Sequence, residues 1–142
     1  MITHISRSEK DTLDIAADFA KTLRPGDFVA LFGGLGMGKT VFVRGLAVGL
    51  GLNADQVSSP TFSLVNEYRA HSAPRLYHFD MYRVVGEDDL HSTGFYDYLD
   101  GESVLAIEWS ENILHALPDK AITITISPGD SESSRVIVID SK

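Results

Sequence analysis

The chain has 142 residues, of which 44% are hydrophobic and 23% are charged, a size and composition that predict one compact domain over residues 1–142. Its formal net charge of −8, with 12 scattered basic residues, disfavours autonomous binding of RNA or DNA, and the absence of cysteine excludes disulfides and thiol nucleophiles. The N-terminus lacks the apolar core of a signal peptide and no apolar run approaches the roughly 18 residues of a membrane span, so we expect a cytoplasmic protein without membrane contact.

The first element that the sequence predicts is a helix that begins after residue 8. Ser8 and Asp11 form a Ser-x-x-Asp pair typical of a capping box, and apolar side chains then recur at helical spacing over residues 13–23. The Pro-Gly pair at 25–26 ends this helix. The short apolar run over 27–32 has no helical period and therefore predicts a buried strand.

The segment after this strand fits the pattern GxxxxGKT of a phosphate-binding P-loop. It consists of Gly33, Gly34, Leu35, Gly36, Met37, Gly38, Lys39 and Thr40. Glycines let the backbone approach an anion closely, and N–H groups at a helix start bind it. In this pattern Lys39 reaches the β- and γ-phosphates, and the Thr40 hydroxyl ligates Mg²⁺. An apolar-sided helix over 41–50, closed by Gly51, gives the strand–loop–helix frame that disfavours the alternative of a plain glycine-rich turn.

The second half of the chain contains further strands and short helices. Strands over 62–68 and 76–81 are joined by a short connection, which favours an antiparallel pair. The polar segment 87–99 predicts short helical turns. Further strands are expected over 103–108, 121–127 and 136–139, with a short helix over 111–117. These elements predict an α/β fold of the P-loop NTPase type, with a mixed, mostly parallel sheet flanked by helices and an antiparallel strand pair.

Two carboxylates close apolar strands, where they could face the P-loop at the carboxyl edge of the sheet. Asp80 is the candidate for a second Mg²⁺ ligand, and the alternative is an ordinary residue of a strand-end turn. Glu108 is the candidate to orient or deprotonate a water at the γ-phosphate, and the alternative is a salt-bridged strand end. The sequence alone leaves both alternatives open.

Three further side chains have weaker signals. Thr61 lies in a Ser-Pro-Thr turn, where P-loop switch proteins often place a threonine that ligates magnesium in the triphosphate state, but a plain turn is the alternative. Trp109 is a candidate to pack on a nucleotide or a partner, although a lone tryptophan is more often a core residue. His78, in an apolar strand, is expected to be a core or surface histidine rather than a ligand.

Several motifs occur together in one order along the chain. They are GGLGMGKT at 33–40, VFVRGL at 41–46, SPTFSLVNEY at 59–68, HFDMYR at 78–83 and IEWSE at 107–111. With these motifs the chain resembles the bacterial TsaE (YjeE) family over essentially its whole length. Members of that family are small P-loop ATPases needed to make threonylcarbamoyladenosine at position 37 of tRNAs that read codons starting with A.

The resemblance implies that ATP is bound by the segment from Gly33 to Val41, with Trp109 near the nucleotide. Three positions depart from the family pattern, which usually has Asp at Gly34, commonly Ala at Met37 and often Thr at Val41. The GxxxxGKT pattern survives all three changes. We therefore expect them to alter nucleotide affinity and rate before they alter function.

The resemblance also implies a catalytic and a metal-binding set. Lys39, Thr61 and Glu108 would be the catalytic residues, with Lys39 on the β- and γ-phosphates, Thr61 sensing the γ-phosphate and Glu108 supporting hydrolysis. Thr40 and Asp80 would hold Mg²⁺, and Glu108 is the further candidate for the metal.

Finally, the resemblance implies partners. The TsaD and TsaB proteins would form the transferase core, and this chain would bind them and reset them by Mg-dependent ATP hydrolysis, weakly when alone. tRNA would be bound through the complex rather than directly, in line with the acidic net charge. Two alternatives stay open, a nucleotide-gated binding module with incidental hydrolysis and a small-molecule kinase, although no acceptor-binding motif supports the kinase.

Overall fold

The computed structural model describes residues 1–60 and 64–141, and this part of the chain folds around one seven-stranded sheet with the order β1-β7-β6-β2-β5-β4-β3. The strands are β1 Ile2–Ser6, β2 Phe28–Phe32, β3 Val65–Tyr68, β4 Leu76–Asp80, β5 Val104–Glu108, β6 Ile122–Pro128 and β7 Arg135–Asp140. The α-helices are α1 Glu9–Ala20, α2 Lys39–Gly49 and α3 Gly86–Ser92, and the 3₁₀ helices are η1 Ala54–Gln56, η2 Phe95–Tyr98 and η3 Ser110–Ala116.

The centre of the sheet is parallel and its flanks are antiparallel. β2 pairs in parallel with β5 and β6, and β5 pairs in parallel with β4. The β3–β4 and β6–β7 hairpins and the β1–β7 pair are antiparallel. The predicted fold class and the predicted antiparallel pair, here β3 and β4, are therefore confirmed.

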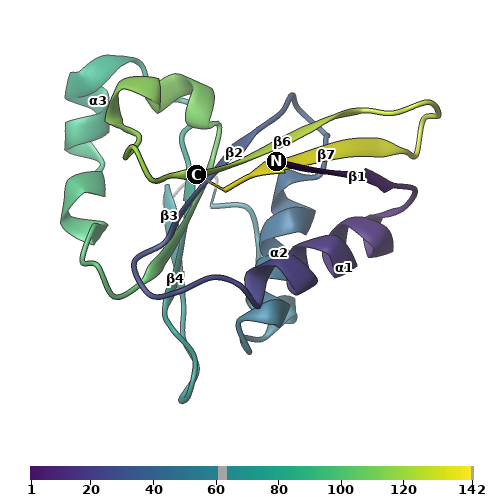
Figure 1. The fold of residues 1–142 in the computed structure, drawn as a ribbon. Helices are drawn as coiled ribbons and strands as arrows, with labels where there is room; N and C mark the ends of the chain where they lie inside the picture. The colour runs from purple at the N-terminus through teal and green to yellow at the C-terminus, as the bar shows by residue number, and fades with distance from the viewer. Residues whose placement is uncertain (61–63, 142) are drawn as a thin grey trace.

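Side-chain alternation along the central strands builds two cores on opposite faces of the sheet. In β2, Val29 and Leu31 face one core together with residues of α1 and α2, whereas Phe28 and Ala30 face the other. The second core also contains residues of α3, η2 and η3. Figure 1 shows α1 and α2 together on one side of the sheet and α3 on the other. Among the described residues, no helix is long and apolar enough to cross a bilayer.

The helix boundaries follow the predicted signals. Ser8 caps α1 by accepting from the N–H of Asp11 (3.0 Å), while the Asp11 carboxylate accepts from the N–H of Arg7 (2.9 Å). Gly51, with φ 85°, closes α2 in a Schellman motif, in which its N–H donates to Val48 O (3.1 Å). The predicted helical turns after residue 86 are present as α3 and η2.

Two elements differ from the sequence-based expectation. β1 is not among the predicted elements, because this edge strand leaves Ile2 and Ile5 exposed and is held by pairing with β7 at the other end of the chain. The helix expected over 111–117 is a kinked 3₁₀ helix, since Trp109 before it is left-handed (φ 58°) and Ile113 has non-helical angles.

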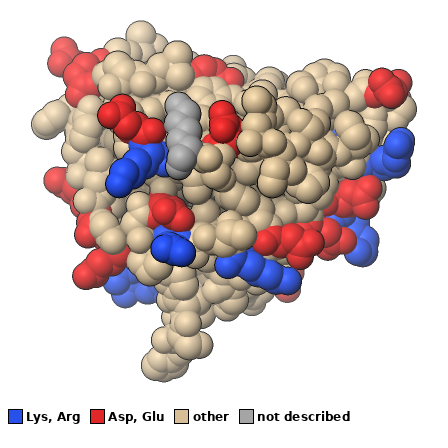
Figure 2. All heavy atoms as spheres, viewed as in Figure 1, with Lys and Arg blue, Asp and Glu red and all other residues tan. Residues whose placement is uncertain are grey.

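The surface carries both signs of charge. Figure 2 shows Lys and Arg side chains dispersed among Asp and Glu on the viewed face, without a continuous basic patch.

Replacement of Gly45 by alanine is expected to destabilise the protein. A Cβ at Gly45 would lie 2.4 Å from Leu13 O and 2.5 Å from Ala16 Cβ, because α1 and α2 touch there. Overpacking costs about 1–3 kcal/mol and exceeds the gain in helix propensity of about 1 kcal/mol. Urea unfolding followed by circular dichroism should show a lower midpoint for Gly45→Ala.

Gly34→Ala is the matched control for this measurement. A Cβ at Gly34 meets nothing within 4 Å, so its free energy of unfolding should change by no more than about 0.5 kcal/mol. A Gly45→Ala protein as stable as the parent would show that the helices separate without cost.

Candidate functional site

The P-loop connects the end of β2 to the start of α2 and has the backbone that its glycines permit. Gly33 has φ 153° and Gly38, the N-cap of α2, has φ 103°. A Cβ at Gly33 would lie 2.7 Å from Ile126 O, so only glycine fits where the loop leaves the sheet. The strand–loop–helix frame expected from the sequence is thus present.

Lys39 is folded over this loop rather than extended into solvent. Its ammonium donates to the carbonyl oxygens of Gly33 and Gly34, the latter at 3.3 Å, and lies 3.5 Å from the centroid of the Trp109 ring. Burial lowers the pKa of Lys39, and the nearby carboxylates of Glu111, Glu108 and Asp80 partly oppose this effect. The site therefore holds a desolvated cation at the start of α2.

Asp80 and Glu108 lie side by side because β4 and β5 pair in parallel register, with Asp80 opposite Glu108. The Thr40 hydroxyl donates to the two Glu108 oxygens at 3.2 and 3.0 Å. Asp80 Oδ1 accepts from the N–H of Tyr82 at 2.9 Å. Burial raises the pKa of Asp80, and the neighbouring Glu108 charge adds to this rise, while the Tyr82 N–H opposes it.

These side chains line one cavity of about 320 Å³, within the range of small-molecule sites. Its lining consists of Glu9, Leu35, Gly36, Met37, Gly38, Lys39, Thr40, Val41, Ser59, Asp80, Glu108 and Trp109. Gly33 and Gly34 lie behind it and bind the Lys39 ammonium. Thr61 falls outside the described residues. A larger cavity of about 1140 Å³ between α1 and the β1 edge of the sheet has no contact with the P-loop.

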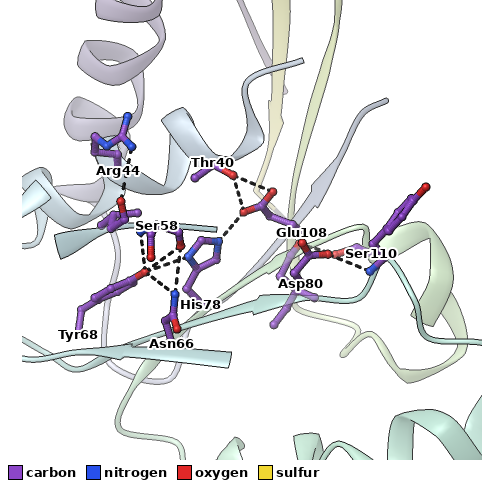
Figure 3. Close-up of polar contacts among 12 residues, drawn as sticks. Thr40, Arg44, Ser58, Asn66, Tyr68, His78, Asp80, Glu108 and Ser110 are labelled. Atoms are coloured by element: carbon purple, nitrogen blue, oxygen red, sulfur yellow. Dashed lines mark hydrogen bonds and ion pairs between the residues drawn. The ribbon is translucent and has the colours of Figure 1, made fainter. Parts of the chain in front are cut away.

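Sequence reasoning missed two groups beside this cavity. Glu111 Oε2 accepts from the N–H of Gly33 at 3.3 Å, across the loop from η3. His78 is fully buried and is therefore a core histidine, one of the two positions expected for it. Its contact with the site was not expected: Nε2 of His78 bonds Glu108 Oε2 at 2.5 Å (Figure 3). The two acidic residues at 108 and 111, on either side of Trp109, were a sequence signal for Glu111. No local sequence signal pointed to the contact of His78.

The residues fit a magnesium nucleotide. Thr40, Asp80 and Glu108 offer the hard oxygen donors that Mg²⁺ prefers. Within the described part of the chain, no group of three or more His, Cys, Asp or Glu side chains could hold a metal by itself.

The sequence model of the family described as "Threonylcarbamoyl adenosine biosynthesis protein TsaE" matches residues 6–137. This chain belongs to the TsaE family. The TsaE protein of Treponema pallidum is 38% identical over 122 residues, 86% of this chain and 88% of that protein. The TsaE protein of Bacillus subtilis is 40% identical, over 87% of this chain and 76% of that protein. The TsaE protein of Aquifex aeolicus is 43% identical, over 75% of each chain.

The fold has a counterpart among solved structures. The crystal structure of Bacillus subtilis YdiB superposes with a TM-score of 0.77 at 31% identity, covering 99% of this chain and 84% of that one. Because the match includes nearly the whole chain, the edge strand β1 and the P-loop frame belong to one shared architecture.

Asp80→Asn is expected to stabilise the protein at neutral pH. Burial raises the pKa of Asp80 in the folded state, so folding takes up a proton between the unfolded and folded pKa values. The contribution of this carboxyl to stability is therefore lost as pH rises through that window. Asparagine keeps an oxygen for the Tyr82 N–H but carries no charge.

Thermal unfolding in metal-free buffer should give a higher Tm for Asp80→Asn at pH 7, and the two Tm values should converge below about pH 4. Asp130→Asn, at an exposed loop position, should leave Tm unchanged at both pH values. A lower Tm for Asp80→Asn at pH 7 would mean that the ionised carboxylate is stabilised in the fold.

Proposed function

We propose that this chain binds and hydrolyses ATP with Mg²⁺, as an accessory subunit that acts on a TsaD–TsaB transferase core in tRNA threonylcarbamoyladenosine biosynthesis in the cytoplasm. The observation that carries the proposal is the convergence of Lys39, Thr40, Asp80 and Glu108 on one cavity at the N-terminus of α2. Membership in the TsaE family supplies the biosynthetic context.

The P-loop residues would bind the phosphates. The N–H groups at the start of α2 and the Lys39 ammonium provide positive potential, and Trp109 provides a flat surface beside them. Lys39 already lies over the loop, so binding exchanges its carbonyl partners for phosphate oxygens. Its desolvated position makes that exchange favourable, because an anion neutralises it better than two carbonyl groups do.

Thr40 and Asp80 would hold Mg²⁺, and when bound the metal neutralises charge on the β- and γ-phosphate oxygens. Glu108 would orient the attacking water and accept its proton, because its carboxylate closes β5 beside the P-loop and is 4% exposed. Thr61 is proposed as the residue that senses the γ-phosphate.

Slow turnover by the isolated chain follows from the contacts of Glu108. Its two oxygens accept from the Thr40 hydroxyl, so both groups must exchange partners before they act on nucleotide and water. A partner protein that favours this exchange would stimulate hydrolysis. The mixed surface charge agrees with tRNA being bound by the assembled complex.

The decisive experiment is Mg-dependent ATP hydrolysis by the purified chain, alone and with TsaD, TsaB and tRNA. We expect weak activity alone and at least about tenfold stimulation by the complex. ATP binding without hydrolysis under either condition would favour a nucleotide-gated module. Phosphate transfer to an added small acceptor, with ATP use that depends on it, would favour a kinase.

A further inference from the structure

A row of buried hydrogen bonds runs behind the candidate site, from Thr40 through Glu108 and His78 to Tyr68 (Figure 3). His78 Nε2 lies 2.5 Å from Glu108 Oε2, and His78 Nδ1 lies 3.3 Å from the Tyr68 hydroxyl. The His78 side chain is fully buried and reaches no solvent. None of the residue roles proposed above uses this histidine.

Strand register explains why the row exists. His78 and Asp80 are two residues apart on β4 and therefore face the same side of the sheet, and Glu108 on β5 lies opposite Asp80. On the other neighbour of β4, Asn66 is opposite His78 and Tyr68 is its diagonal neighbour. The imidazole thus bridges between β5 and β3.

The contacts of Glu108 indicate what His78 does for it. A carboxylate only accepts hydrogen bonds, so Nε2 of His78 donates to Glu108, and the Thr40 hydroxyl donates from the other side. Burying a carboxylate is costly unless donors satisfy it. Glu108 is therefore fixed between the Thr40 hydroxyl on α2 and the His78 imidazole on β4. Of these two donors, only Thr40 is among the proposed nucleotide-binding residues.

The other end of the row reaches the segment between α2 and β3. The Tyr68 hydroxyl donates to Ser58 O at 3.2 Å and accepts from the Ser58 N–H at 3.3 Å. Asn66 Nδ2 donates to both the Tyr68 hydroxyl (3.2 Å) and Ser58 O (3.1 Å). The neighbouring Ser59 lines the cavity, so Tyr68 is bonded to the backbone one residue before the cavity wall.

The Tyr68 hydroxyl has one hydrogen and two acceptors in reach, Ser58 O and His78 Nδ1. With Ser58 in place the two acceptors compete for this hydrogen, and without Ser58 O only His78 Nδ1 would accept it. The hydrogen bonding of the imidazole, and through it the position of Glu108, therefore depends on the position of Ser58.

We propose that His78 is a positioning residue for Glu108, and that Tyr68 links it to the backbone at Ser58, so that the position of the Ser58 backbone controls where the Glu108 carboxylate points. The inference rests on the proposed function, because it assigns a regulator to the proposed hydrolytic carboxylate. All the contacts that it uses lie within this chain and need no partner protein.

Two amide variants separate positioning from packing. In His78→Gln the amide nitrogen comes close to the place of Nε2 and can still donate to Glu108, whereas in His78→Asn it comes close to Nδ1 and cannot. We expect His78→Asn to lower kcat about tenfold and His78→Gln to retain kcat within about threefold, because a small misplacement of a catalytic group is costly. Nucleotide affinity, read from Trp109 fluorescence, should stay within about twofold for both.

Tyr68→Phe tests the link to Ser58, because it removes one hydroxyl and keeps the ring. We expect a loss in kcat of about threefold at unchanged nucleotide affinity, and no further loss when it is combined with His78→Asn. His71→Asn and Tyr96→Phe, at the β3–β4 turn and in η2, are the controls and should match the parent. Equal losses in His78→Asn and His78→Gln, or an unchanged kcat in both, would overturn the proposal.

An NMR readout tests the row of contacts independently of ATP hydrolysis. If the parent chain hydrolyses no ATP with its partners, the proposed function fails, but the contacts of His78 can still be tested. The buried Nε2–H of His78 should give an exchange-protected imidazole proton signal by NMR that disappears in His78→Asn. Glu108→Gln and Tyr68→Phe should each shift this signal, whereas His71→Asn should not. A signal that neither variant shifts would show that the row of contacts is not coupled.

Discussion

Replacing Lys39 with alanine is expected to weaken ATP binding at least about 100-fold, which corresponds to about 2.7 kcal/mol, while the protein stays folded. The ammonium belongs to the first residue of α2, and burial has already removed part of its hydration. A phosphate therefore gains a charge-assisted partner without the full cost of desolvating it. Alanine removes the charge and leaves the P-loop backbone in place.

Trp109 supplies the measurement, since it is the chain's one tryptophan and Lys39 lies over its ring. Titration with a non-hydrolysable ATP analogue should change the emission of the parent, whereas Lys39→Ala should not reach half of its change below about 100 times the parent Kd. Lys21→Ala, which removes an exposed lysine at the end of α1, should titrate like the parent. Full affinity in Lys39→Ala would rule out the P-loop assignment.

The effect on folding should be small. The ammonium is desolvated and only partly compensated by carbonyl oxygens and the Trp109 ring. Its removal therefore loses these contacts but also relieves the cost of desolvating the charge. We expect the free energy of unfolding to change by no more than about 1 kcal/mol. Retained far-UV circular dichroism separates lost affinity from lost structure.

The elements that the sequence predicted well are those whose signals are local. The P-loop, its two flanking elements and the Schellman closure at Gly51 each depend on residues within one turn of one another. The helix cap at Ser8 is equally local. By contrast, β1 depends on a partner strand at the far end of the chain, and no short-range pattern encodes that pairing.

The site divides along the same line. That Asp80 and Glu108 would both end strands followed from their flanking apolar runs, but their direct opposition required β4 and β5 to be parallel neighbours. The link from His78 to Tyr68 is a diagonal contact across a hairpin, which a one-residue change of register would abolish. Glu111 reaches Gly33 only because the chain turns sharply at a left-handed Trp109.

Glu108→Gln is expected to lower kcat about 10²–10³-fold and to leave ATP affinity equal or slightly higher. Glutamine keeps an oxygen that accepts from Thr40 or His78 and preserves the volume of the side chain. It removes the negative charge that would orient water and accept a proton. Loss of a carboxylate beside the phosphates also removes a repulsion, so binding should not weaken. Alanine is a poorer test, because it would leave the buried His78 donor and the partly buried Thr40 hydroxyl without this acceptor, at a cost of about 1–3 kcal/mol.

Single-turnover hydrolysis with the partner proteins present measures the effect of Glu108→Gln on the rate, and the Trp109 titration measures its effect on ATP affinity. Glu102→Gln, in the exposed loop before β5, removes the same charge outside the cavity and should hydrolyse ATP at the parent rate. If Glu108→Gln binds ATP but no longer hydrolyses it, and tRNA modification stops, then hydrolysis is required. If modification continues at the parent rate without hydrolysis, nucleotide binding alone carries the function, and the chain is a nucleotide-gated module. The distinction depends on Glu108 because this carboxylate is the one proposed to act on the attacking water, while glutamine keeps the acceptor for the Thr40 hydroxyl.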